Sequence, residues 1–243
     1  MSKFKDEVTW NPTTGCTNIS TGCSKCYAKC FAEQFRGIKG HSYEQGLTFK
    51  MHEDRLLQPY RWKEPRNVYI NSMGDLFYDE VPDEFILKVF KVIQDTPQHT
   101  YRLLTRRAER MSQWFRKYCM GDYYGNLCVG VAVENEDTAD NIFCLNDIDA
   151  LIKYVSFEPL IEAIDPIVLT LADLNWVIVS GETGSGARQM KKKWVDSLYE
   201  ESRHQGIPFY FKQWGEFNEK GLKVGRNKAG KLYNGQLIQE KPY

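Results

Sequence analysis

The chain has 243 residues, of which 42% are hydrophobic and 26% charged, so it is too apolar for a disordered chain and long enough for one α/β barrel. The chain has 32 basic residues (Lys and Arg) and 32 acidic residues (Asp and Glu), so its formal net charge is zero. This excludes a protein that is basic over its whole surface, and a nucleic acid could bind only at a local basic region. No stretch has the roughly 20 apolar residues of a membrane helix. The start, Met1–Glu7, turns acidic and reaches no apolar core, which does not resemble a secretory signal, so we expect a cytoplasmic protein.

Short runs of β-branched and aromatic residues alternate along the chain with segments of helical periodicity. Strands are predicted over residues 7–10, 67–71, 101–105, 127–133, 152–157, 175–180 and 208–212. Helices are predicted over the segment with Tyr27, Phe31 and Phe35, from Pro82 to Ile93, over Met111–Tyr118, weakly over 134–148, and from Trp194 to a stop at Gly206 and Pro208.

This alternation predicts the fold class and the domain organisation. Strands that alternate with helices pair in parallel through right-handed crossovers. With about seven strands, the expected fold is α/β, a full or incomplete (β/α) TIM-like barrel with parallel strands. We assign residues 1–216 to this barrel. Residues 217–243 are rich in Gly, Lys and Asn and are expected to form a peripheral appendage, a hairpin on the surface.

Polar side chains follow each predicted strand. Because the carboxyl ends of parallel strands share one edge, we expect these side chains at one rim. They are Asn71, Ser72, Asp75, Thr105, Arg106, Arg107, Glu134, Asn135, Ser156, Glu158, Ser180, Gly181, Glu182, Lys212, Gln213 and Glu216. Three of them, Glu134, Glu158 and Glu182, each follow a strand, and their carboxylates could hold a cationic ligand group, a metal or a transferable proton. Any one of these residues alone is more often structural than catalytic.

A glycine-rich segment, Gly181–Arg188, has the glycine spacing of a phosphate-binding loop. Ala187 and Arg188 stand where that loop needs a lysine and a hydroxyl residue, so a nucleotide-hydrolysing loop is excluded. Two interpretations remain: a turn that lets the backbone approach a ligand, and a tight strand-to-helix turn without a ligand.

Four of the seven cysteines lie together after the first predicted strand. Cys16, Cys23 and Cys26 have the spacing C-x6-C-x2-C, and Cys30 follows one helical turn later. Three thiolates could bind three irons of a 4Fe-4S cluster and leave the fourth iron open. Cys30 could instead complete a structural zinc site with four sulfur ligands, and unliganded thiols are a third interpretation. The spacing alone does not separate these alternatives.

Seven segments in order support a resemblance to a known family. They are residues 10–16 (WNPTTGC), 22–27 (GCSKCY), 71–77 (NSMGDLF), 104–111 (LTRRAERM), 156–160 (SFEPL), 176–182 (WVIVSGE) and 211–216 (FKQWGE). Together they resemble the phage-type three-Cys-motif family, which is of uncharacterised function and similar to radical S-adenosylmethionine (SAM) enzymes. The resemblance extends over nearly the whole chain. The first cysteine spacing is longer than the usual C-x3-C-x2-C, a departure that a longer loop can tolerate.

The resemblance implies roles for individual residues. Cys16, Cys23 and Cys26 would bind the 4Fe-4S cluster, with Cys30 incidental. Tyr27 would pack near the adenine of SAM. The loop with Asn71, Ser72 and Asp75 would meet the methionine amino group, and Glu134 would suit the ribose hydroxyls.

The resemblance also implies a reaction. An electron from the reduced cluster would cleave a carbon–sulfur bond of SAM, and the resulting 5′-deoxyadenosyl radical would abstract hydrogen from a substrate. The candidate catalytic residues are Glu158, Glu182 and Lys212. Arg106, Arg107, Arg188 and Lys212 could receive an anionic substrate such as a nucleotide or nucleic acid, or could simply pair with the glutamates of the rim.

Two further hypotheses remain open at this point. A zinc-stabilised barrel could act as a binding or accessory protein without radical chemistry. The resemblance also implies a companion protein encoded nearby, although no feature of the sequence indicates the contact.

Overall fold

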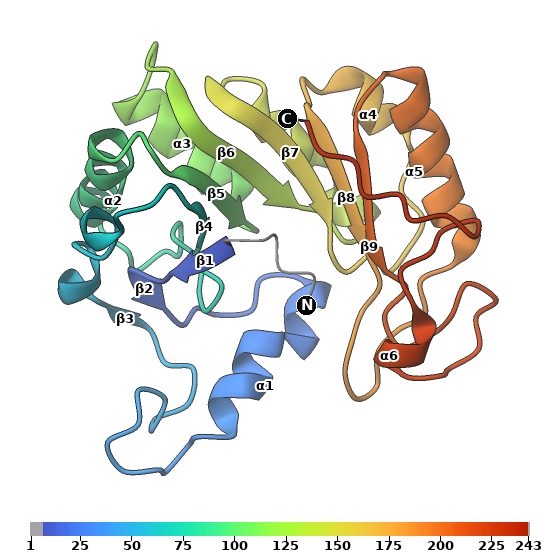
Figure 1. The fold of residues 1–243 in the computed structure, drawn as a ribbon, viewed down its shortest axis with the longest axis horizontal. Helices are drawn as coiled ribbons and strands as arrows, with labels where there is room; N and C mark the ends of the chain where they lie inside the picture. Colours follow the sequence, from blue (N-terminus) through green and yellow to red (C-terminus); the bar gives the residue numbers. More distant parts are fainter. Residues whose placement is uncertain (1–6, 243) are drawn as a thin grey trace. The chain divides into compact units, whose positions relative to one another are not determined.

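The computed structural model describes residues 7–242 of the chain, shown as a ribbon in Figure 1. The strands are β1 (Glu7–Trp10), β2 (Thr13–Thr14), β3 (Lys50–Met51), β4 (Asn67–Ile70), β5 (Thr100–Thr105), β6 (Tyr124–Ala132), β7 (Ala150–Phe157), β8 (Trp176–Ser180) and β9 (Phe209–Gln213). The α-helices are α1 (Tyr27–Glu33), α2 (Asp83–Asp95), α3 (Ala108–Tyr118), α4 (Ile167–Leu171), α5 (Lys192–His204) and α6 (Arg226–Ala229). The 3-10 helices are η1 (Thr21–Lys25), η2 (Glu53–Arg55), η3 (Pro59–Arg61) and η4 (Glu136–Leu145).

The strand order follows the chain. Within the described residues, seven strands form one sheet in the order β1-β4-β5-β6-β7-β8-β9, while β2 and β3 form a separate antiparallel pair. The pairs β1–β4, β4–β5, β7–β8 and β8–β9 run parallel. This is the order that successive βα units produce, so the predicted α/β class with the strand order of a (β/α) barrel is confirmed. Each predicted strand is present, with small shifts at its ends.

The chain divides into two compact units. The first runs to Val129 and includes residues 149–151, and the second consists of Gly130–Ile148 and the chain from Ile152 onward. The first unit contains the cysteine loop, and the second contains the strands that end in the predicted catalytic residues.

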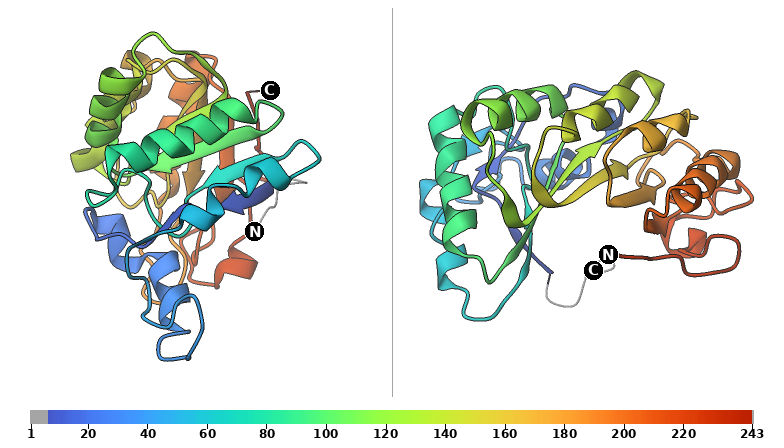
Figure 2. Two further views of the ribbon diagram at one scale, coloured as in Figure 1. Left: turned by 90° about the vertical axis from the view of Figure 1, so that its left-hand side faces the viewer. Right: turned by 90° about the horizontal axis from the view of Figure 1, so that it is seen from above.

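Helices α2 and α3 cover the outer side of the first unit's strands (Figure 2). Helix α2 buries Phe85, Ile86, Val89, Phe90 and Ile93, a set with the i, i+3, i+4 spacing of one helical face. The ring of Phe90 packs against Trp114 of α3, with centroids 4.5 Å apart. Such burial of large side chains is the main source of stability for these helices.

In the second unit the central strand is buried along its whole length. All five residues of β8 are buried, as expected of a parallel strand covered on both faces. Helix α5 adds Trp194, Val195 and Leu198 to the core and ends before Gly206, which has φ 68°. The predicted stop of this helix is confirmed, because glycine adopts this left-handed conformation without steric cost.

The segment 134–148, for which a weak helix was predicted, is helical within those bounds. It forms η4, a 3-10 helix that begins with a capping box between Asn135 and Thr138. Its buried residues Ala139, Ile142 and Leu145 recur every three positions, which matches the three residues per turn of a 3-10 helix. The structure therefore adds the type of this helix and shortens it to Glu136–Leu145.

The C-terminal tail was expected to be a hairpin on residues 217–243. In its described part the structure has α6 and two short antiparallel bridges, Phe217 to Lys223 and Tyr233 to Gln236. Another antiparallel bridge joins Gln239 to Tyr210 of β9. The boundary after residue 216 stays a prediction. Among the described residues, none of the helices has the length and apolar character needed to traverse a bilayer.

Candidate functional site

The cysteines lie on the segment that follows β1. After β2 and Gly15 the chain reaches Cys16, then enters η1, which contains Cys23. Cys26 lies between η1 and α1 as the residue before the helix. These three thiols are free and partly buried, whereas the free thiol residue Cys30 is exposed on α1. The predicted C-x6-C-x2-C set therefore lies on one loop that ends at the residue before the helix.

Gly15 turns the backbone toward the loop that follows β4. Its φ is 80°, and a Cβ at this position would lie 2.3 Å from the carbonyl oxygen of Thr48. Its N–H donates to the carbonyl of Met73 at 2.8 Å. A residue with a side chain would therefore meet both backbone strain and a collision. This turn ties the residue directly before Cys16 to the Asn71–Asp75 loop.

Asn71 lies at the start of that loop with one side-chain atom unsatisfied. The residue has φ 59° and is 5% exposed. Its Nδ2 donates to Oγ1 of Thr13 at 2.5 Å, three residues before Cys16. Its Oδ1 is buried and has no hydrogen-bond partner among the described residues. A buried acceptor without a donor is uncommon, and an ammonium group would satisfy it.

Tyr27 and helix α1 pack on the same loop. The Tyr27 hydroxyl donates to the carbonyl of Ser72 at 2.5 Å, and burial at the hydroxyl end raises the pKa of this phenol. The rest of the residue is open, since Tyr27 as a whole is 61% exposed. Ala28 and Ala32 of α1 form a small apolar cluster with Met73, to which Cys26, Tyr43 and Leu47 add partly buried surface. The helix is thus fixed while an aromatic face next to Cys26 stays exposed.

Asp75 and Arg107 fasten the cysteine loop from below the surface. The Asp75 carboxylate accepts from the Thr105 hydroxyl at 2.7 Å and from the backbone N–H groups of Phe77 and Arg106. Its Oδ2 also lies 3.4 Å from Nη1 of Arg107. Arg107 in turn donates through Nη2 to the carbonyl of Thr17 at 3.1 Å, directly after Cys16.

These contacts determine which predicted roles remain open for the two residues. Arg107 is 7% exposed and Asp75 6% exposed. The carboxylate that pairs with Arg107 is that of Asp75 and not one of the rim glutamates, and Arg107 also donates to Thr17. The two residues hold the loop in place, and the predicted contact of Asp75 with SAM stays a prediction.

The thiols influence one another electrostatically. Burial raises the pKa of Cys16 to about 11, and the negative charge of Asp75 adds to this effect, while Arg107 opposes it. The negative charges that Cys26 and Cys23 carry when ionised raise it further, as the smallest of these effects. Over residues 7–242, however, no three His, Cys, Asp or Glu side chains are already grouped to hold a metal ion.

The donor set fits a metal centre by its chemistry. The loop offers three free thiols, and cysteine thiolates are the usual ligands of iron–sulfur clusters and common ligands of structural zinc. Bound metal would draw these sulfurs together and stabilise their thiolate form.

The predicted catalytic residues belong to the second unit and form ion pairs there. Nζ of Lys212 at the end of β9 lies 2.7 Å from Oε2 of Glu158. Glu182, which is 5% exposed, accepts from the backbone N–H of Arg188 at 2.7 Å and from its Nε at 2.9 Å. The alternative that Arg188 and Lys212 pair with glutamates of the rim is therefore confirmed. The catalytic roles of Glu158, Glu182 and Lys212 stay predictions, as does the contact of Glu134 with ribose.

The Gly181–Arg188 segment has the features of a tight turn. A Cβ at Gly181 would lie 2.0 Å from the carbonyl oxygen of Trp214, so the close approach that requires glycine is to the protein's own backbone. Gly184 has φ 99°, and its N–H donates to Oε1 of Glu216 at 2.9 Å. The structural reason for these glycines favours the turn interpretation over a ligand loop.

Sequence reasoning missed the residues that position the site. Thr13 lies three residues before Cys16 and accepts a hydrogen bond from Asn71, and Thr17 directly follows Cys16 and accepts one from Arg107. No sequence pattern marks either threonine. The signal for Gly15 was present, since a glycine directly before the first cysteine is compatible with a left-handed turn.

Comparisons with known proteins give a family and a set of distant folds. The model of a family described as "Protein of unknown function (DUF5131)" matches residues 3–242. We found no curated protein that matches the chain. Among solved structures, the chain is similar to spore photoproduct lyase complexed with dinucleoside spore photoproduct, with 12% identity and a TM-score of 0.49 over 79% of this chain and 59% of that chain. A mutant of that enzyme with bound AdoMet and the same dinucleoside gives 11% identity and a TM-score of 0.47, over 80% of this chain and 60% of that chain. The chain thus spans about three-fifths of the length of these structures.

Proposed function

Because the chain belongs to DUF5131, a family of proteins of unknown function, we propose its activity from its own residues. We infer that it is an iron–sulfur, SAM-dependent radical enzyme in which Cys16, Cys23 and Cys26 bind a 4Fe-4S cluster. The observation that carries this proposal is the joining of the thiol loop to the Asn71–Asp75 loop, with the buried Oδ1 of Asn71 left without a partner among the described residues.

The bound cofactors would supply the difficult step of the chemistry. With one electron from an external reductant, the cluster would support cleavage of a carbon–sulfur bond in SAM, to give methionine and, after hydrogen abstraction from the substrate, 5′-deoxyadenosine. The protein's contribution is to orient the reactants and to exclude water.

The residues of the first unit have distinct tasks in this proposal. Oδ1 of Asn71 accepts a hydrogen bond from the methionine ammonium group, and the exposed face of Tyr27 packs against adenine. The carbonyl of Ser72 holds the Tyr27 hydroxyl, so Ser72 positions that ring. Arg107 and Asp75 keep the cysteine loop in place.

The remaining parts of the proposal concern substrate and setting. A nucleotide or a nucleic acid is the proposed substrate, with Glu158, Glu182 and Lys212 as the groups that contact it. None of the seven cysteines forms a disulfide within the described residues, which suits a reducing compartment and supports a cytoplasmic location. A companion protein stays part of the proposal.

The test is anaerobic reconstitution with iron and sulfide, followed by metal analysis, electron paramagnetic resonance and an assay for 5′-deoxyadenosine. We expect about four irons per chain and SAM cleavage on reduction. Cys16→Ser, Cys23→Ser and Cys26→Ser should each abolish the cluster signal and the product.

Cys30→Ser is the matched control, since it changes an exposed thiol on α1 and should leave both signals intact. Stoichiometric zinc that is lost in Cys30→Ser as well, together with no SAM cleavage, would contradict the proposal and support the zinc-stabilised binding protein.

A further inference from the structure

The C-terminal tail carries a run of cations with no acidic residue among them. Residues 220–239 contain no Asp or Glu and five cations, which we call the basic tail: Lys220, Lys223, Arg226, Lys228 and Lys231. In a chain with 32 residues of each sign this is a strong local imbalance. Protein surfaces usually intersperse the two signs, so the imbalance points to a polyanionic partner.

These five side chains are available to such a partner. All five residues are exposed. Arg226 donates through Nε to Oε1 of Gln213 at 3.2 Å, but no ion pair is formed by any of the five within residues 7–242. They differ in this from Arg188 and Lys212, whose charges are matched by Glu182 and Glu158. Five unmatched charges in water can neutralise phosphates without first breaking an internal pair.

The backbone that carries the basic tail is held in place. Trp214 donates through Nε1 to the carbonyl of Leu232 at 2.8 Å and through its backbone N–H to Gly230 at 3.3 Å. Tyr233, which is 1% exposed, packs on Phe209 with ring centroids 6.5 Å apart and donates its hydroxyl to Asp196 at 2.7 Å. A fixed backbone lowers the entropy lost when the side chains bind a partner.

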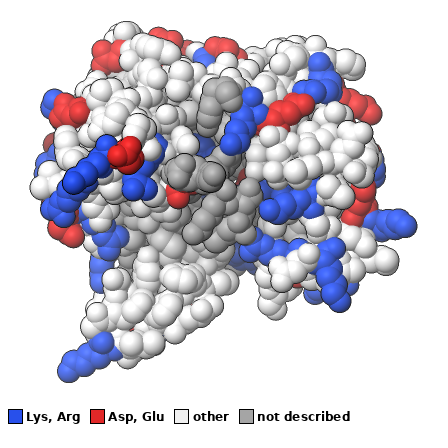
Figure 3. All heavy atoms as spheres, in the orientation of Figure 1, with Lys and Arg blue, Asp and Glu red and all other residues white. Residues whose placement is uncertain are grey.

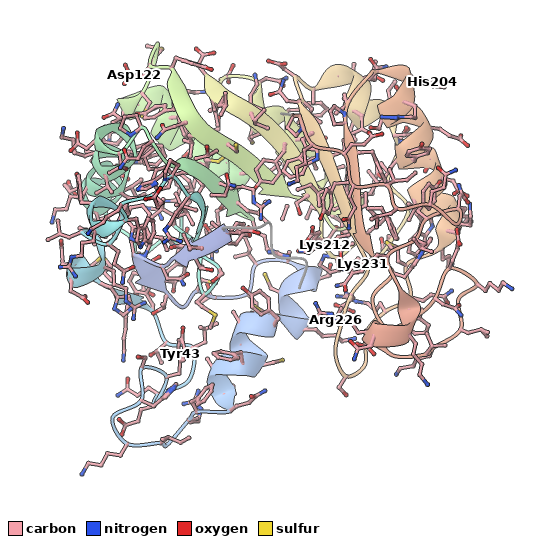
Figure 4. The ribbon with its side chains drawn as sticks, viewed as in Figure 1. Tyr43, Asp122, His204, Lys212, Arg226 and Lys231 are labelled. Carbon is pink, nitrogen blue, oxygen red and sulfur yellow. The ribbon has the colours of Figure 1, made fainter. Side chains whose placement is uncertain are left out.

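The basic tail lies next to the carboxyl end of β9. The contact of Arg226 with Gln213 places α6 beside the residue that follows Lys212. Figure 4 labels Lys212, Arg226 and Lys231 in this part of the second unit, and Figure 3 shows blue side chains gathered around α6. Arg226 therefore lies beside the end of β9, the strand that carries Lys212, whose ion-pair partner Glu158 follows β7.

We propose that the basic tail binds the sugar–phosphate backbone of a nucleic acid, independently of base sequence. This inference rests on the proposed function, because it makes a nucleic acid the substrate that is presented to the strand ends of the second unit. Uniform cations suit the evenly repeated charges of phosphodiesters. A membrane surface fits less well, since α6 has only four residues and offers no amphipathic helix.

The experiment compares two variants of equal charge in the reconstituted full-length protein. Lys223→Gln, Lys228→Gln and Lys231→Gln together remove three cations of the basic tail. The matched control is the triple change Lys39→Gln, Lys63→Gln and Lys193→Gln, which removes three exposed cations elsewhere. Binding of a fluorescein-labelled 20-nucleotide strand of mixed sequence, single or in a duplex, is followed by anisotropy over a range of salt concentrations.

For the wild type and the control we expect a slope of log affinity against log salt of about −4 on the duplex. The tail variant should bind at least about tenfold more weakly, and its slope should be less steep by about one for each cation removed. Equal binding by the two variants, or no binding by the wild type at low salt, overturns the inference. Binding to anionic phospholipid vesicles that depends on the tail, without such binding to the oligonucleotides, overturns it too.

Cluster content and 5′-deoxyadenosine formation without the oligonucleotide are measured on the same preparations. A tail variant that keeps its cluster content and its 5′-deoxyadenosine formation, but no longer binds the oligonucleotide, supports the inference. A wild type that binds the strand through the tail but cleaves no SAM refutes the proposed function and leaves the binding surface standing.

Discussion

Asn71 has a left-handed backbone conformation, and only the nitrogen of its side-chain amide has a hydrogen-bond partner among the described residues. Its φ of 59° is a conformation that asparagine tolerates better than most residues, and its amide nitrogen is committed to Thr13. The free Oδ1 is thus held in one orientation before any ligand arrives. This preorganisation is what a site for an ammonium group requires.

Asn71→Gly keeps the backbone conformation and removes the acceptor. Loss of one hydrogen bond to a charged group should raise the apparent Kd for SAM roughly tenfold, measured by equilibrium dialysis on reconstituted protein. The matched control is Asn234→Gly, at a described asparagine with φ 49°, which should leave SAM binding unchanged. Unaltered SAM affinity in the Asn71 variant would rule out the assigned contact, provided that its iron content equals that of the wild type.

Asp75 and Arg107 illustrate how a polar residue at a strand end can serve a structural purpose. Both are buried, and the four donors on the Asp75 carboxylate compensate the cost of removing it from water. The pair links the end of β4 to the residue after Cys16. A buried charged pair of this kind adds little net stability, because the cost of removing both charges from water offsets their attraction.

At the scale of elements, the turn at Gly15 is the joint between the cysteine loop and the β4 loop. Its neighbour in that contact is Gly74, where a Cβ would approach the Gly15 backbone to 3.1 Å. A side chain at Gly74 would thus be tightly placed against Gly15, and one at Gly15 would collide with the backbone of Thr48. The path of the cysteine loop is therefore set by backbone packing before any cofactor is bound.

Gly15→Ala should lower the free energy of unfolding by more than about 2 kcal/mol, because it adds a collision with Thr48 to the strain of positive φ. Gly37→Ala is the matched control: Gly37 also has φ 80°, but a Cβ there meets nothing within 4 Å. We expect it to cost only about 1 kcal/mol. Urea unfolding followed by circular dichroism measures both, and equal losses would contradict the role of the close contact.

At the scale of the whole molecule, several acidic groups are buried in neutral form. Burial raises the pKa of Cys128 to about 12 and that of Tyr101 to about 12. It also raises the pKa of Tyr124 and Tyr233. All four residues belong to the cores of their units. Their protonated forms are thus part of what stabilises the fold.

Stability should fall at alkaline pH. In the unfolded chain Cys128 loses its proton near 9.0, whereas in the folded protein it keeps it to about 12. The unfolded state therefore binds fewer protons between these values, so the stabilisation is complete below pH 9 and declines as pH rises toward 12. We expect a loss of at least about 2 kcal/mol by pH 11, measured by urea unfolding.

Cys128→Ala should weaken that pH dependence, whatever it does to stability at pH 7. The exposed Cys30→Ala serves as its control and should keep the full dependence. A free energy of unfolding that is the same at pH 8 and pH 11 would contradict the assigned burial effect.

The sequence by itself determined the α/β class, the seven strands and their parallel order. Periodicity and stop signals such as Gly206 carry this information locally, because each helix or strand must present its apolar side to the core. It also singled out Cys16, Cys23 and Cys26, since clustered cysteines are visible without a fold. A helix over 134–148 was predicted, but its 3-10 type was not, because a helical pattern does not record side-chain hydrogen bonds such as the capping box of Asn135 and Thr138.

Only the tertiary structure decided which polar side chains form internal ion pairs and hydrogen bonds that stabilise the fold, and which remain available to a ligand. Arg107, Arg188 and Lys212 are of the same chemical type as the cations of the basic tail, yet their charges are matched by carboxylates far away in the sequence or across a turn. Within the described part of the chain, no donor lies near Oδ1 of Asn71 and no carboxylate pairs with the cations of the basic tail. Both facts depend on which residues are neighbours in three dimensions. Hydrogen bonds and ion pairs act over a few ångströms in space, and the order of residues along a chain does not fix which of them come that close.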